Sequence, residues 1–335
     1  MRIRKLLRVR FVVDPFTEQE KIMAELTPMM QKYMETKEQY KDCILFYRLG
    51  DFYEMFFDDA LVASKELEIT LTGKSCGLEE RAPMCGIPYH AVEGYLSKLV
   101  SRGYKVAICE QVEDPKLAKG LVKREVIRVV TPGTNLNVQS LEAGKNNYLL
   151  SIAYTPDGIG ISAADVTTGD YYVTEVEDLK KLNDELMKYE PSEIICNEAF
   201  LVSGFDVNDL KSRLHISVNA LESHMFDDDG CRRILMKHFK VNTLIGLGVE
   251  EFPTGLLAAG ALLQYLYDTQ KTDLEHFTHI YPYLTSKYML LDSSTRRNLE
   301  LTETLREKQK RGSLLWVLDK TKTAMGARLL RNYIE

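Results

Sequence analysis

The spacing of apolar and polar residues predicts that the first part of the chain alternates between helix and strand. Residues 27–40 repeat apolar side chains at helical spacing, and they begin with a threonine and a proline, which are typical of a helix start. Residues 43–49 are rich in aromatic and aliphatic side chains, which favours a strand. A Gly-Asp pair follows and allows a turn into a second extended segment at residues 52–57.

The same mixture continues up to residue 134. Asp58 and Asp59 are suitable capping residues for a further helix. Residues 73–88 contain three glycines and two prolines, so we expect a loop there. The remaining pattern predicts a helix over residues 91–100, strands over 104–111 and 125–130, a turn at 131–134 and a linker over 135–146.

The second part of the chain has the pattern of a layered α/β domain. Extended segments at residues 147–154 and 159–166 flank a Pro-Asp-Gly turn, which indicates a β-meander. A helical pattern at 179–189 then precedes a short apolar strand at 193–196. Because this gives a β-α-β succession, we expect helices packed on a sheet in a domain that extends to about residue 275.

The last part of the chain is predicted to be helical. Residues 255–269 form a strongly apolar helix, and from Asp292 onward Leu, Arg, Glu and Lys recur at helical spacing. The final residues, 332–335, include no glycine or proline that would end a helix. We therefore expect this helical region to be a truncated part of a domain whose packing partners lie outside the chain.

Length and charge limit the classes of function. The 335 residues exceed what one hydrophobic core usually organises, so two or three domains are expected. No apolar run approaches the length of roughly 20 residues that a membrane-spanning helix needs, which excludes a transmembrane protein. The net charge of -6 disfavours a surface that wraps nucleic acid throughout, because phosphate contacts need clustered Lys and Arg. Any contact with DNA is thus expected to be local.

The six cysteines and the basic start of the chain carry no separate function in this interpretation. The cysteines are scattered without a C-x-x-C pair, which favours buried free thiols in a reducing cytosol over a zinc site. Residues 1–22 open with a basic stretch, but its apolar segments are too broken for a secretory signal. We expect them to form a disordered extension.

Five motifs in order resemble those of the MutS mismatch-repair family. The first is Phe46-Tyr47-Arg48-Leu49-Gly50-Asp51-Phe52-Tyr53-Glu54-Met55-Phe56, which resembles the family's mismatch-reading segment with its Phe-x-Glu core. The other four are residues 84–92 (MCGIPYHAV), 106–111 (VAICEQ), 129–134 (VVTPGT) and 291–301 (LDSSTRRNLEL). The resemblance runs from about Met23 to Glu335.

The resemblance assigns the mismatch contacts to Phe52 and Glu54. In a strand these two side chains share one face, whereas Tyr53 points to the other. An aromatic wedge enters most easily where a base is already mispaired, and a carboxylate beside phosphates is favourable only if it hydrogen-bonds a base. In the family the Phe stacks on the mispaired base and the Glu bonds to it. The alternative interpretation is that Phe52 is a core aromatic residue and that Glu54 is a solvated surface charge.

Three basic residues are possible phosphate contacts, namely Arg48, Lys74 and Lys98, although an ordinary solvated surface explains them equally well. Lys74 lies in Gly73-Lys74-Ser75, which looks like the end of a phosphate-binding loop. The glycine required five residues earlier is replaced by Glu68, so ATP binding there is rejected. In full-length members of the family, ATP and Mg bind far beyond the end of this chain. We therefore expect no cofactor, no metal and no catalysis in this chain.

A second near match is the pair Asp165 and Asp170, which lies in a region that resembles a ribonuclease-H-like domain. A nuclease would use such carboxylates to hold two metal ions, but a turn at Thr168-Gly169 explains both residues. The family uses this region as a connector and as a docking surface for MutL-type partners. A protein-interaction role through residues 147–275 is therefore the competing hypothesis, and a fragment without an independent role is a third.

The resemblance implies an α/β multidomain fold. It predicts a mixed α+β mismatch-binding domain at residues 23–135, a ribonuclease-H-like α/β connector domain at 147–275 and the start of an all-α core domain at 276–335. The expected partners are mismatched duplex DNA and a MutL-type protein, with self-association only in full-length members of the family and no membrane. The expected location is cytoplasmic.

Overall fold

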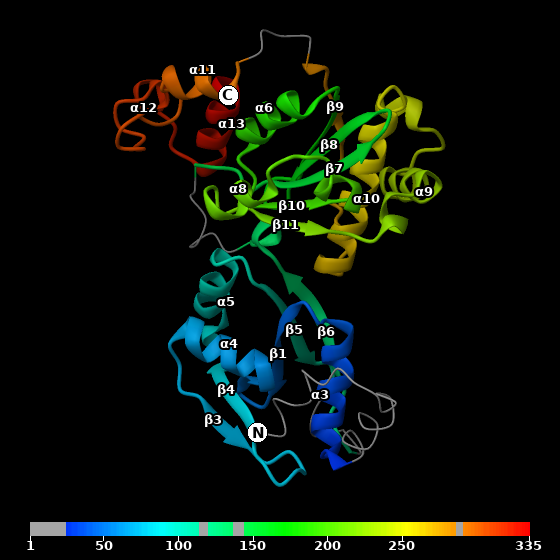
Figure 1. The fold of residues 1–335 in the computed structure, drawn as a ribbon, viewed down its shortest axis with the longest axis vertical. Helices are drawn as coiled ribbons and strands as arrows, with labels where there is room; N and C mark the ends of the chain where they lie inside the picture. Colours follow the sequence, from blue (N-terminus) through cyan, green and yellow to red (C-terminus); the bar gives the residue numbers. More distant parts are fainter. Residues whose placement is uncertain (1–24, 114–119, 137–143, 286–290) are drawn as a thin grey trace. The chain divides into compact units, whose positions relative to one another are not determined.

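The computed structural model describes residues 25–113, 120–136, 144–285 and 291–335, and the expectations for residues 1–22 and for most of the linker lie outside this part. The chain divides into two compact units (Figure 1). Unit 1 comprises Met1–His90 and Ile108–Val126, and unit 2 comprises Ala91–Ala107 and Ile127–Glu335.

The N-terminal region is built on a six-stranded sheet with the order β3-β4-β2-β1-β5-β6. Its strands are β1 (Cys43–Leu49), β2 (Phe52–Phe56), β3 (Thr72–Lys74), β4 (Ala82–Pro88), β5 (Lys105–Gln111) and β6 (Arg124–Val130). The helices of this region are α3 (Pro28–Gln39), α4 (Phe57–Leu67) and α5 (Val92–Ser101), with short 3-10 turns η1 (Tyr89–Ala91) and η2 (Pro132–Thr134). The predicted helix at 27–40, the helix at 91–100 and all four predicted strands are confirmed.

Helix α3 is held against the sheet by aromatic packing. Tyr33 is buried, and its ring meets those of Tyr47 and Phe56 edge-on at centroid distances of 5.4 and 4.9 Å. Edge-to-face aromatic pairs add stability beyond the apolar area that they bury. This packing fixes strands β1 and β2 from one side.

Two local predictions in this region are wrong. The expected loop over residues 73–88 contains β3 and β4, and residues 84–88 of β4 pair antiparallel with β2. The glycines and prolines suggested a loop, but pairing on both sides keeps β4 extended. The expected caps are also different, because Phe56 is the N-cap of α4 and no side chain caps it. Asp59 instead accepts hydrogen bonds from Leu45 N, 2.9 Å away, and from Tyr33.

Unit 2 contains a second six-stranded sheet with the order β11-β10-β7-β8-β9-β12. Its strands are β7 (Leu149–Thr155), β8 (Gly158–Asp165), β9 (Asp170–Val176), β10 (Glu193–Cys196), β11 (Ser217–Ala220) and β12 (Tyr281–Pro282). Strands β7, β8 and β9 form the predicted antiparallel meander, whereas β10 runs parallel to both β7 and β11. The predicted β-α-β succession is confirmed.

Helices cover both faces of this sheet, because successive side chains along its strands point into two different hydrophobic cores. Leu149 and Ile195 belong to one hydrophobic cluster and their neighbours Leu150 and Ile194 to the other. The helices of this domain are α6 (Leu179–Tyr189), α7 (Glu198–Leu201), α8 (Val207–Ser212), α9 (Asp228–Phe239) and α10 (Pro253–Gln270), with 3-10 turns η3 (Ser223–Phe226) and η4 (Leu244–Leu247). Helices α9 and α10 contribute to the first cluster and α6 and α8 to the second, which gives three layers.

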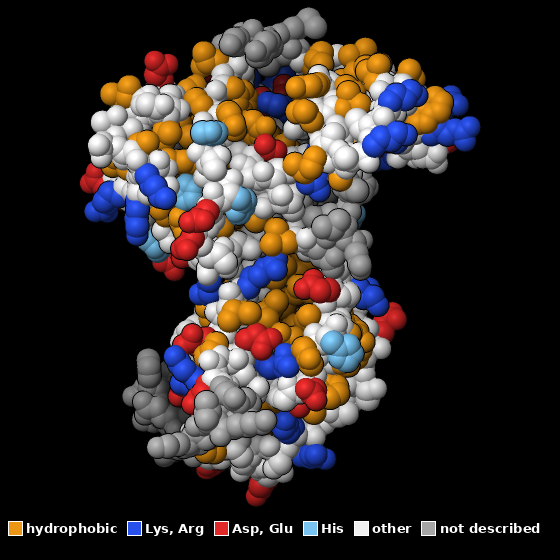
Figure 2. Space-filling model, turned by 180° about the vertical axis from the view of Figure 1, so that it is seen from behind, with side chains coloured by type: hydrophobic (Ala, Val, Ile, Leu, Met, Phe, Trp, Pro, Cys, Tyr) orange, Lys and Arg blue, Asp and Glu red, His pale blue; other side chains and the backbone are white. Residues whose placement is uncertain are grey.

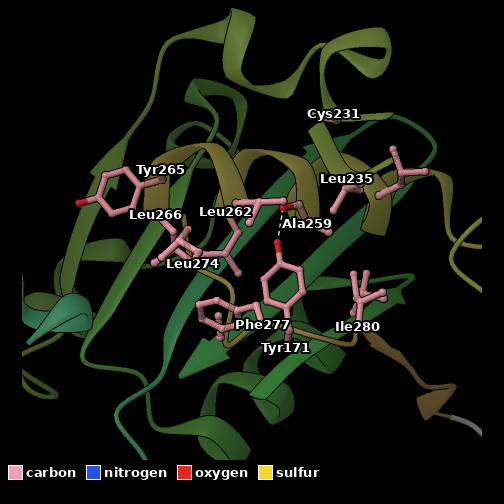
Figure 3. Close-up of a cluster of buried hydrophobic side chains, with 14 of the residues drawn as sticks. Tyr171, Cys231, Leu235, Ala259, Leu262, Tyr265, Leu266, Leu274, Phe277 and Ile280 are labelled. Carbon is pink, nitrogen blue, oxygen red and sulfur yellow. Dashed lines mark hydrogen bonds between the residues drawn. The ribbon is translucent and has the colours of Figure 1, made fainter. Parts of the chain in front are cut away.

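The first cluster is centred on α10 (Figure 3). Tyr171 of β9 is fully buried there, and its hydroxyl donates a hydrogen bond of 2.5 Å to the carbonyl of Ala259. Leu262, Leu266 and Phe277 surround it. The apolar helix predicted at residues 255–269 is therefore a helix buried on nearly all sides.

The C-terminal residues form three short helices: α11 (Ser293–Asn298), α12 (Leu314–Leu318) and α13 (Ala324–Ile334). The region from residue 276 is not purely helical, because β12 adds to the edge of the second sheet beside β9. In the described ranges, no helix is long and apolar enough to cross a membrane. The fold is thus an α/β multidomain one with two separate sheets, as expected.

All six cysteines are free and buried, as predicted. Burial raises the pKa of Cys85, Cys109, Cys196 and Cys231 to about 12, which keeps these thiols protonated at neutral pH.

Candidate nucleic-acid interface

A tight hairpin presents Phe52 at the surface of unit 1. Strands β1 and β2 pair antiparallel, with Leu49 opposite Phe52, and Gly50 makes the turn in a left-handed conformation with φ of 59°. The carbonyl of Asp51 accepts a hydrogen bond of 3.0 Å from Tyr89 N, which ties the turn to the end of β4. The Phe52 side chain is 47% exposed although it stands on a central strand.

The alternation along β2 separates Phe52 and Glu54 from Tyr53. Tyr53 is buried, and its ring lies 5.9 Å from that of Phe46. Its hydroxyl donates a hydrogen bond to Glu110, and its pKa is raised, mainly by burial and further by this hydrogen bond. Phe52 and Glu54 share the other face, as the strand periodicity predicts. Phe52 is therefore not a core aromatic residue.

The neighbouring strand leaves space beside these two side chains. Gly86 of β4 pairs with Glu54, and a Cβ at Gly86 would lie 3.6 Å from Glu54 Cγ and 3.9 Å from Phe52 Cδ1. A hollow of about 610 Å³ lies here, and it is lined by Phe52, Glu54, Glu68, Ile69, Thr70, Thr72, Met84 and Gly86. The motif at residues 84–92 marked this segment in the sequence, but its part in forming the hollow was missed.

Glu54 is not a solvated surface charge either. Its side chain is 16% exposed, and its Oε2 lies 2.5 Å from Nζ of Lys74 on β3. The Lys74 ammonium also lies 5.6 Å from the centroid of the buried Phe56 ring. The structure thus brings together Phe52, Glu54 and one of the three predicted basic residues.

Arg48 is engaged within the protein. Its guanidinium lies 3.7 Å from the centroid of the Tyr89 ring and 3.3 Å from Glu110 Oε1, and its Nε donates to the carbonyl of Gly50. Its side chain is 16% exposed. These contacts hold the β1–β2 hairpin in place, so Arg48 and Glu110 support the position of Phe52 and Glu54. The sequence motifs contained Glu110 without indicating this role.

Lys98 is exposed on α5 in unit 2. Residues 294–335 of the same unit are rich in basic side chains. Residues 294–335 contain ten Lys and Arg side chains against five Asp and Glu, whereas the whole chain has a net charge of -6. Figure 2 shows Lys and Arg side chains beside hydrophobic ones over the C-terminal helices at its upper right. Positive charge is therefore concentrated in residues 294–335.

The two aspartates considered for metal binding accept hydrogen bonds from the turn between them and from Asn146 and Asn147. Oδ1 of Asp165 accepts hydrogen bonds from the backbone and side chain of Thr167, and Oδ2 accepts one of 3.1 Å from Asn147 N. Asp170 accepts from Asn146 and Thr168. In the described part of the chain, no group of three or more His, Cys, Asp or Glu side chains has the geometry of a metal site.

Together these features define a class: a multidomain α/β protein whose N-terminal sheet exposes an aromatic residue beside a half-sheltered carboxylate. Three family models match successive regions of the chain and narrow this class. MutS domain I matches residues 27–139, MutS domain II matches 147–278 and MutS domain III matches 294–335. The chain belongs to the MutS family and carries these three domains in order.

Individual relatives agree with this assignment. The DNA mismatch repair protein MutS of Lachnoclostridium phytofermentans is 70% identical over 313 residues, which cover 93% of this chain and 34% of that protein. The proteins of the same name from Ruminiclostridium cellulolyticum and Acetivibrio thermocellus are 55% and 54% identical, and each match covers 93% of this chain and 36% of the relative. The chain thus spans about a third of the length of the curated relatives that it matches.

Proposed function

We propose that this chain recognises mispaired bases in duplex DNA as part of DNA mismatch repair. The observation that carries the proposal is the exposed Phe52 ring next to the Glu54 carboxylate on one face of β2, within a hairpin that is fixed on its other face. The names of the relatives support a role in DNA mismatch repair. The match of residues 27–139 to MutS domain I supports the assignment of mismatch recognition to this region.

Phe52 acts as the wedge. A phenyl ring inserted through the minor groove must unstack a base step, which costs a few kcal/mol in a matched duplex and less where a base is mispaired. The ring has to be held rigidly, because a mobile side chain would lose rotamer freedom on insertion. The hairpin meets this need, since Tyr53 is buried directly behind Phe52 and Arg48 stacks on Tyr89.

Glu54 acts as the base contact. A carboxylate accepts hydrogen bonds and donates none when ionised, so it pairs with an N–H that a mispair leaves exposed. Gly86 leaves open the side from which a base edge approaches, because it places no side chain beside Glu54. In a matched duplex the base N–H groups are already paired, so the carboxylate gains no hydrogen bond there that would offset its loss of water.

The test compares the affinity of the purified chain for a G·T-mismatched duplex and for its matched control, by fluorescence anisotropy at low and moderate salt. We expect tighter binding to the mismatch and loss of this preference in Phe52→Ala. Leu61→Ala is the matched control, because Leu61 is also a large exposed apolar residue of unit 1, at 45% exposure, but lies on α4. Equal discrimination in Phe52→Ala and in the unchanged chain would overturn the proposal.

Docking of a MutL-type protein through residues 147–275 stays a prediction from the family resemblance. A pull-down with such a partner tests it, and binding must depend on these residues. Nucleotide chemistry and self-association likewise stay expectations for full-length members of the family.

A further inference from the structure

We propose that Lys74 is a positioning residue for mismatch reading, which holds the Glu54 carboxylate in place and neutralises it against the DNA backbone. This inference rests on the proposed function of Glu54. It differs from a direct contact between Lys74 and a phosphate, which would strengthen binding to every duplex alike.

The ion pair between Lys74 and Glu54 spans strand β4. Lys74 stands on β3 and Glu54 on β2, and β4 lies between them in the sheet. The two charged atoms are 2.5 Å apart, and their side chains are only 34% and 16% exposed. A partly sheltered pair of this kind is screened less by salt than a pair on an open surface. It therefore persists in the ionic conditions under which DNA binds.

The pair orients the carboxylate. Lys74 Nζ contacts Oε2 of Glu54, and among the described residues no donor bonds Oε1. Oε1 is thus the oxygen available to a base N–H. The ammonium lies 5.6 Å from the centroid of the Phe56 ring, and Phe56 is buried, so this neighbour limits where Nζ can move. A fixed Nζ in turn limits the rotamers of Glu54.

The pair also changes the electrostatic cost of approaching DNA. An unpaired carboxylate is repelled by phosphates on both strands, whereas an adjacent ammonium makes the pair nearly neutral at the distance of a phosphate. Because the ammonium is occupied by Glu54, Lys74 lowers the cost of Glu54 approaching the duplex instead of adding a separate contact. Replacement of Lys74 is consequently expected to act through Glu54.

A double-mutant cycle with Lys74→Met, Glu54→Gln and the combined variant tests this dependence. For each form of the full chain, affinities for the G·T and matched duplexes are measured at two salt concentrations. We expect Lys74→Met to lower the ratio of mismatched to matched affinity roughly tenfold, the equivalent of one charged hydrogen bond. In the Glu54→Gln background the same replacement should leave that ratio unchanged. Lys74→Arg should restore most of it.

Lys65→Met is the matched control, since Lys65 is an exposed lysine of the same unit on α4. A uniform loss of affinity for both duplexes in Lys74→Met that is equally large in the Glu54→Gln background, with a salt slope reduced by about one, would identify a phosphate contact and overturn the positioning role. An equal loss of discrimination with and without Glu54 would overturn it too. If Phe52→Ala keeps full discrimination, the proposed function fails first; if no duplex binds at low salt, both proposals fail for this chain.

Discussion

The buried carboxylate of Glu193 accepts a hydrogen bond from the side chain of Thr131, 62 positions earlier in the chain. Thr131 precedes the η2 turn, and Gly133 N of that turn donates to the same carboxylate oxygen over 3.0 Å. The other oxygen accepts from Asn219 at 2.9 Å and from the Tyr265 hydroxyl at 2.7 Å. One acidic side chain therefore joins η2, β11 and α10 to the start of β10.

Replacement of Glu193 by alanine should destabilise unit 2 strongly. It would remove the acceptor of four hydrogen bonds in a fully buried place, and each donor that is left unsatisfied there costs about 1–3 kcal/mol. The Thr131 hydroxyl and the Asn219 amide keep their contacts with Thr134 and Ser217. We expect a loss of at least about 3 kcal/mol in the free energy of unfolding, measured by urea denaturation. Glu193→Gln keeps one acceptor oxygen and should lose less.

Glu198→Ala is the control for this experiment, because Glu198 is an exposed acidic residue five positions further on. Its replacement should change the free energy of unfolding by no more than about 0.5 kcal/mol. If Glu193→Ala unfolded at the same urea concentration as Glu198→Ala, the Glu193 carboxylate would not hold these segments together.

A close approach between β8 and α10 leads to a second prediction. A Cβ at Gly160 would lie 2.0 Å from the backbone oxygen of Thr254, so Gly160→Ala forces the helix and strand apart. We expect a loss of about 3 kcal/mol or more, or failure to fold. Gly94→Ala is the contrasting change, because Gly94 lies inside α5 and a Cβ there would meet nothing within 4 Å.

The Gly94 variant should gain stability. Alanine has a higher helix propensity than glycine, which favours α5 by up to about 1 kcal/mol. Both variants can be compared by the midpoint of thermal unfolding. A midpoint for Gly160→Ala at or above that of Gly94→Ala would contradict the packing of β8 against α10.

The third prediction concerns pH. Burial raises the pKa of Asp59, while Lys37, whose Nζ lies 2.9 Å from Asp59 Oδ1, lowers it. A carboxyl whose pKa is higher in the folded than in the unfolded protein favours folding most when protonated, and this contribution is lost as pH rises through the folded pKa. Lys37→Met removes the compensating charge and should raise the pKa of Asp59 further.

The cost of Lys37→Met should therefore depend on pH. We expect a loss of about 3 kcal/mol at pH 7 and a smaller loss at pH 4, because protonation progressively removes the charge on Asp59 that Lys37 no longer compensates. Urea denaturation at both values checks this. Lys32→Met, which breaks an exposed pair with Glu35 on the same helix, should cost below about 1 kcal/mol at either pH. A loss that stays constant between pH 7 and 4 would exclude the charge on Asp59 as its cause.

Most of the regular elements and the two candidate mismatch residues follow from the amino-acid sequence. Strand Cys43–Leu49 and helix Leu179–Tyr189 begin and end where their side-chain periodicity predicts. Periodicity also put Phe52 and Glu54 on one face, because successive side chains of a strand point in opposite directions. Their proposed roles came from the resemblance to the MutS family, which ordered motifs revealed without any geometry.

The partners that these residues meet depend on the three-dimensional arrangement of distant segments. Strand β4 was missed because its glycine and prolines disfavour a strand locally, and pairing with β2 and β3 overrides that preference. Lys74 and Glu54 are 20 positions apart, so no local pattern could pair them. The same holds for Glu193, whose four donors come from distant segments: a buried charge has to find partners wherever the fold supplies them.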